Sequence, residues 1–125
     1  MVLYKGYRAA RVLLIFRLPK FYHECCSEPL AFLEWFDPFN MAVEAHHRLP
    51  TTRPSMQRGA RETAIIPIRL IRASCHLIPN YDLLDQQLQI TAESDLLSIA
   101  PQLFLSRHSS YYMFALMDHW RRITN

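Results

Sequence analysis

The sequence has few glycines, few cysteines and no long apolar run: two Gly and three Cys occur in 125 residues. A run such as 12–16 is far shorter than the about 20 residues that a membrane-spanning helix needs. The cysteine count is odd and Cys25 adjoins Cys26, which argues against the disulfide framework of a secreted domain. We therefore expect no membrane span and an intracellular, reducing location, the nucleus being one such compartment.

The chain also lacks internal repeats and low-complexity segments. Half of its residues are hydrophobic and one fifth are charged, a composition that supports a folded core. A chain of this length suffices for one compact domain and is too short for two of ordinary size. The sequence therefore predicts a single domain over 1–125 that needs neither disulfides nor metals to fold.

Short apolar segments with alternating side chains, bounded by prolines, predict a mainly β protein. The expected strands cover 10–18, 30–39, 64–66, 74–78 and 111–117, with a helix as the alternative for the last. The strand over 30–39 is apolar on both faces, so Glu34 should find a partner or an edge. Helical structure is expected as one turn after Pro67 and as a short helix capped by Thr91 or Ser94.

The fold class predicted from these segments is a β-rich α+β fold. It would form a small open barrel or sandwich with one or two short helices. Residues 40–62 contain two prolines, a glycine and little periodicity, so they are expected to form a long basic loop. A loop of this length is unusual within a compact domain and is often functional.

Positive charge is concentrated in the first part of the chain. Residues 1–72 hold eleven basic against six acidic side chains, whereas 73–125 hold three against five. Arginine suits phosphate contact because its planar fork binds two oxygens at once. The candidate nucleic-acid contacts are the arginines of 48–72, where Glu62 is the sole acid: Arg48, Arg53, Arg58, Arg61, Arg69 and Arg72. A solvated surface without a ligand is the alternative explanation.

No pattern in the sequence indicates catalysis or a bound metal. Cys75 and His76 adjoin in an expected strand, where neighbouring side chains point to opposite faces, so Cys75 should lie inward and His76 outward. The cysteines and histidines lack the spacing of zinc knuckles, which leaves only a site assembled from distant elements. The acids are too scattered for a two-metal nuclease centre. We therefore expect a protein that is not an enzyme and holds no cofactor.

Exposed aromatic side chains could stack on nucleic-acid bases. The pairs Trp35–Phe36 and Tyr111–Tyr112 are candidates, although core packing is the more common role of such residues.

Four segments occur in an order that resembles the C-terminal region of fungal Plavaka-type transposases, relatives of the CACTA-like elements. They are "GYRAARVLLIFRLP", "PLAFLEWFDPF", "AIIPIRLIRASCHLIPNY" and "RHSSYYMFAL". The matching residues are Leu30, Ala31, Glu34, Trp35, Phe36, Ile65, Ile66, Pro67, Ile71, Arg72, Ser74, His76, Leu77, Pro79, Arg107 and His108. The family's Asn-Pro-Phe-x-Asp is replaced by "QLFLS", and 82–103 fits poorly, which suggests a diverged or truncated copy.

The resemblance implies a non-catalytic accessory domain. Separately, the β-rich order, with an Ile-Pro turn feeding a strand, looks like a small barrel of the bromo-adjacent-homology kind, an analogy at the level of fold. Its expected function is contact with a nucleic-acid backbone without sequence readout. The expected partners are DNA, through the arginine-rich loop, and the rest of a transposase-like protein. The alternative is a transposon remnant or protein-interaction fragment with no autonomous activity.

Overall fold

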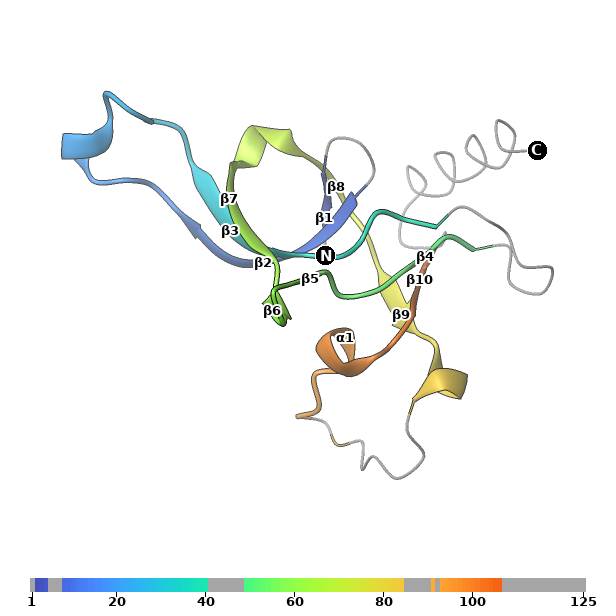
Figure 1. The fold of residues 1–125 in the computed structure, drawn as a ribbon. Helices are drawn as coiled ribbons and strands as arrows, with labels where there is room; N and C mark the ends of the chain where they lie inside the picture. Colours follow the sequence, from blue (N-terminus) through green and yellow to red (C-terminus); the bar gives the residue numbers. More distant parts are fainter. Residues whose placement is uncertain (1, 5–7, 41–48, 85–90, 92, 107–125) are drawn as a thin grey trace. The chain divides into compact units, whose positions relative to one another are not determined.

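A computed structural model describes residues 2–4, 8–40, 49–84, 91 and 93–106 (Figure 1). The chain divides into two compact units, one of residues 1–38 with 55–74 and the other of 39–54 with 75–125. The protein is mainly β, as the sequence predicts, with three small sheets and one short α-helix in the described part. None of the described helices is long and apolar enough to cross a membrane.

The first unit contains a five-stranded antiparallel sheet. Its strands are β1 (Val2–Tyr4), β2 (Arg8–Phe16), β3 (Leu30–Trp35), β7 (Thr63–Pro67) and β8 (Ile71–Ser74). They are arranged in the order β7-β3-β2-β1-β8. The sequence therefore located β2, β3 and β7 correctly, each to within a few residues.

The connection between the two edge strands forces this sheet to curve. In a flat five-stranded sheet the edges would be about 19 Å apart, since neighbouring strands are about 4.8 Å apart. Only the 3-10 turn η2 (Ile68–Leu70) joins β7 to β8, and the chain from Pro67 to Ile71 reaches at most about 14 Å when extended. The sheet must therefore bend into a partly closed, barrel-like shape, as Figure 1 shows.

The concave face of this sheet carries the core of the first unit. Side chains alternate along β3, so Ala31, Leu33 and Trp35 point to the same side. Ala10 of β2 and Ile66 of β7 complete this buried cluster. The packing residues around it are Val12, Ala64, Ile68, Leu70 and Ile71. A register shift between Val12 and Leu14 adds a bulge to β2, which increases local twist and favours the curvature.

The segment 40–62, predicted as a long basic loop, contains three strands of two residues in its described part. They are β4 (Thr51–Thr52), β5 (Met56–Gln57) and β6 (Ala60–Arg61). Arg58 and Gly59 join β5 to β6 with φ values of 52° and 80°. Two positive φ values are typical of a type I′ hairpin turn, whose usual sequence is Asn-Gly or Asp-Gly. An Arg-Gly pair lacks this signal, so the hairpin was missed.

The second unit contains a three-stranded sheet in the order β4-β10-β9. Strand β9 covers Leu77–Pro79 and β10 covers Leu103–Leu105. The segment 74–78 was predicted as one strand, and this prediction is wrong: β8 ends at Ser74 and pairs with β1, whereas β9 begins at Leu77 and pairs with β10. Alternation continues through Cys75 and His76 and so conceals the change of sheet.

The helical segments of the second unit are short. The 3-10 turn η3 covers Tyr81–Leu83, and α1 covers Leu96–Ile99 with Asp95 as its N-cap residue. Neither Thr91 nor Ser94 caps α1, because the helix begins one residue later than expected and Asp95 is its N-cap residue. The Thr91 N–H donates to Ser94 Oγ (2.9 Å) in the preceding turn. The strand expected over 111–117 lies outside the described residues.

Candidate functional site

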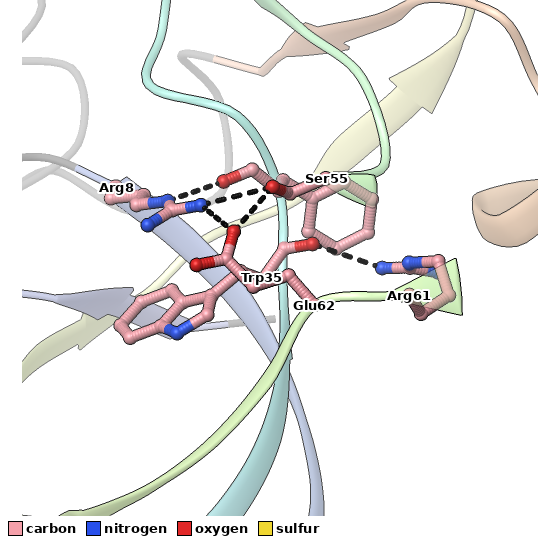
Figure 2. Close-up of polar contacts among 6 residues, drawn as sticks. Arg8, Trp35, Ser55, Arg61 and Glu62 are labelled. Carbon is pink, nitrogen blue, oxygen red and sulfur yellow. Dashed lines mark hydrogen bonds and ion pairs between the residues drawn. The ribbon is translucent and has the colours of Figure 1, made fainter. Parts of the chain in front are cut away.

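A polar cluster in the first unit joins β2 to the end of β3 and to residues 55–62 (Figure 2). Arg8 donates from Nη2 to Glu62 Oε2 (2.7 Å) and to Ser55 Oγ (3.1 Å), and from Nε to the Phe36 carbonyl (2.7 Å). The Ser55 hydroxyl donates to the same Glu62 oxygen (2.5 Å). The Arg8 guanidinium also lies over the Trp35 ring, 4.7 Å from its centroid. The Arg8 guanidinium thus connects β2 to three residues that are distant from it in sequence, Phe36, Ser55 and Glu62.

The hydrogen bonds at Glu62 favour its charged form. The Ser55 hydroxyl contributes most, followed by Arg8, and together they lower the pKa of Glu62 despite the opposing effect of burial. Charge-assisted hydrogen bonds of this kind are roughly twice as strong as neutral ones. Glu62 is therefore a stabilising carboxylate and lacks the raised pKa of a general acid.

Arg61, one of the predicted phosphate contacts, is bound within the protein. Its Nη2 donates to the Trp35 carbonyl (3.1 Å), and its Nη1 lies 3.5 Å from Glu34 Oε2. The guanidinium also lies over the Phe36 ring, 5.1 Å from the centroid. Glu34 thus has the partner that the sequence predicted, and Arg61 has a structural role.

Three other predicted arginines are exposed on the first unit. Arg58 lies in the β5–β6 turn, Arg69 in η2 and Arg72 in β8. Arg69 donates from Nε to Glu28 Oε2 (2.9 Å), in a pair whose side chains are 66% and 38% exposed. Neither the Arg58 nor the Arg72 side chain forms a hydrogen bond or ion pair with another residue that the structure describes. These guanidinium groups can reach a ligand without breaking the core.

The two remaining predicted arginines do not belong to this set. Arg53 is exposed after β4 in the second unit, and Arg48 lies outside the described residues. The structure therefore places Arg58, Arg69 and Arg72 in one unit.

The Cys75–His76 pair is arranged as expected for a pair without nucleophilic function. Cys75 is 6% exposed, and burial raises the pKa of its thiol to about 11. His76 is exposed. A buried, protonated thiol is a poor nucleophile, because the thiolate is the reactive form.

The other sequence candidates are also accounted for. Among the described residues, no group of three or more His, Cys, Asp or Glu side chains is arranged to hold a metal ion. Trp35 and Phe36 are buried, so their rings cannot stack on bases. Tyr111 and Tyr112 lie outside the described part of the chain.

Arg8 and Ser55 were not predicted as important residues. The signal that could have found them is Glu62, the sole acid among the arginines of 48–72. Its partner is Arg8, 54 positions away in sequence, and not one of the arginines of its own segment.

Comparisons with protein-family models, with curated proteins and with solved structures find no match.

Proposed function

We propose that this chain is a non-catalytic accessory domain, of the transposase-derived kind suggested by its sequence, that contacts a nucleic-acid backbone without reading its sequence. The proposal also implies a nuclear location, with DNA and the rest of a transposase-like protein as partners. The observation that supports it is the set of exposed arginines on the first unit, Arg58, Arg69 and Arg72.

The acids of the first unit are largely paired, so its exposed charge is positive. Glu62 pairs with Arg8, Glu34 with Arg61 and Glu28 with Arg69. Among the described residues of this unit, eight are basic and five are acidic. Such a surface attracts phosphates through counterion release, which is independent of base sequence.

The proposed backbone contacts can be tested by replacing Arg58 and Arg72 with alanine. If both contact phosphate, the slope of log K against log salt for a DNA duplex should fall by about two units, and all duplexes should be weakened similarly. The measurement is fluorescence anisotropy of labelled duplexes between about 50 and 200 mM salt. Arg61 is not a suitable target, because its replacement would also disturb Trp35 and Glu34.

The matched control changes both residues to lysine. This variant keeps the charge and should keep most of the slope, although lysine cannot form the bidentate fork. An unchanged slope in the alanine variant would exclude these two arginines as contacts.

A protein-interaction fragment is the second candidate, favoured by an exposed apolar row on the convex face of the sheet. Leu14 and Ile65 are 56% and 59% exposed and are both cross-strand neighbours of Phe32. Failure of the wild-type chain to bind any nucleic acid would favour this function over the first.

A further inference from the structure

The connection between β2 and β3 exposes two aromatic rings. Phe21 is 94% exposed and Tyr22 is 56% exposed, both in the 3-10 turn η1 (Lys20–Tyr22). This turn lies at the tip of the β2–β3 hairpin, coloured blue in Figure 1. Full burial of an aromatic ring would stabilise the protein, and exposed apolar groups that cluster often mark a contact surface.

The turn holds these rings on an ordered backbone. The Tyr22 N–H donates to the Pro19 carbonyl (2.9 Å), and the Tyr22 carbonyl accepts from the N–H groups of Cys25 and Cys26 (3.0 Å each). The His23 ring nitrogen Nε2 lies 2.9 Å from the Leu18 carbonyl. A ligand that contacts such a turn loses less affinity to ordering the loop than it would with a flexible chain.

Two exposed cations flank the rings. Arg17 precedes η1 and Lys20 begins it; both are exposed, and neither side chain forms a hydrogen bond or ion pair with another described residue. The connection also carries two acids. Glu28 is paired with Arg69, and Glu24 is exposed.

We propose that Phe21 and Tyr22 stack on unpaired bases and that Arg17 and Lys20 bind the adjacent phosphates, which makes η1 a site for single-stranded nucleic acid. Aromatic rings beside cations are the combination that single-strand-binding proteins use, since every base offers a π-face and every phosphate a charge. A duplex hides the faces of its bases, so the rings should discriminate between the two forms. The inference rests on the proposed function in requiring nucleic acid, but it uses residues other than Arg58 and Arg72.

The test compares the full chain with the variant Phe21→Ala/Tyr22→Ala, using oligo(dT) and a duplex of equal length as probes. Loss of base stacking should weaken oligo(dT) binding about fivefold or more per ring. Duplex affinity should stay unchanged, and so should the salt slope for both probes, because no charge is removed. The matched control is Tyr81→Ala, which removes a ring that is 59% exposed on η3 in the second unit.

A second variant provides a direct readout of stacking. Phe21→Trp keeps an aromatic ring and should keep the affinity, and oligo(dT) should quench tryptophan fluorescence more than in the wild type. Thermal melts of all variants should match the wild type, because Phe21 contributes little to the core.

Three outcomes would overturn the inference. They are equal weakening of both probes, oligo(dT) affinity that does not change in the alanine variant, and failure of the wild type to bind oligo(dT). If the duplex salt slope still falls in the Arg58/Arg72 variant, the proposed function stands while this inference fails. If the rings prove essential and the slope does not change, the inference stands and the arginine assignment fails.

Discussion

Arg8 and Arg69 each pair with a glutamate, but the surroundings of the two pairs differ. The Arg8–Glu62 side chains are 24% and 30% exposed, and the hydrogen bonds of Ser55 and the Phe36 carbonyl extend the pair. The Arg69 side chain is 66% exposed. Exposed ion pairs typically contribute little to stability, whereas removing one member of a partly buried network leaves polar groups unsatisfied.

We therefore expect Glu62→Gln to destabilise the protein by about 1–2 kcal/mol. The amide keeps the shape of the carboxylate but cannot match its charge against Arg8, or accept as strongly from Ser55. The measurement is urea unfolding at neutral pH. The control is Glu28→Gln, which alters the exposed pair and should have an effect near zero. Equal losses in the two variants would contradict a special role for the Arg8 cluster.

The lowered pKa of Glu62 also predicts how the stability of the protein depends on pH. The folded protein lowers the pKa of Glu62, so its stabilising effect is fully present above the ordinary glutamate pKa of about 4.3. The effect is lost as the pH falls through the lower, folded-state value, because the unfolded chain binds the proton more readily. The difference in unfolding free energy between wild type and Glu62→Gln should therefore shrink in acid. A difference that stays constant down to the acid limit of folding would contradict this account.

At the scale of elements, the β5–β6 hairpin depends on one glycine. Gly59 has a φ of 80°, and a Cβ built on it would meet no atom within 4 Å. The constraint is therefore the backbone conformation and not lack of space.

Gly59→Ala should destabilise the protein by about 1–2 kcal/mol, the usual cost of a left-handed residue with a Cβ. Gly59→Asn is the matched control, since asparagine adopts this conformation more readily and should cost less. The measurement is thermal unfolding of both variants against the wild type. Equal stability of alanine variant and wild type would show that the hairpin does not keep its turn in solution.

The elements that the sequence predicted best are those whose pattern is local. Alternation and proline boundaries located β2, β3 and β7, and Pro67 indicated the single turn η2. The split at Cys75–His76 could not be predicted, because it depends on which distant strands pair with β8 and β9. The hairpin turn at Arg58 was hidden by a residue that rarely occupies it.

The sequence predicted the residue type of the candidate site, arginine, but it did not predict which arginines have a structural role and which are exposed. Arginine enrichment drew attention to 48–72, yet charge alone could not separate Arg61, which binds Trp35 and Glu34, from the exposed Arg58. Phe21 was not singled out either, since exposure of an aromatic residue depends on the tertiary fold. Whether an arginine is bound internally or an aromatic ring is exposed depends on contacts between strands far apart in sequence.

At the scale of the whole molecule, the division into two units indicates which part of the chain should fold independently. Residues 1–74 include all five strands of the curved sheet, its buried cluster and the Arg8–Glu62 network. The segment 39–54, assigned to the other unit, would then be a linker within the fragment.

We therefore expect a fragment of residues 1–74 to fold on its own, with a β-rich circular dichroism spectrum and a cooperative melt. At this length the margin of stability is small, because a domain of such size buries only about 60% of its unfolded surface. Trp35 is the sole tryptophan of the fragment and is 7% exposed, so its fluorescence should shift to the red in the same transition. The control is Leu33→Asp, which places a charge in the buried cluster and should abolish the transition. A coil-like spectrum from the unmodified fragment would show that the five strands need the remainder of the chain, and would favour a single cooperative domain over the full length.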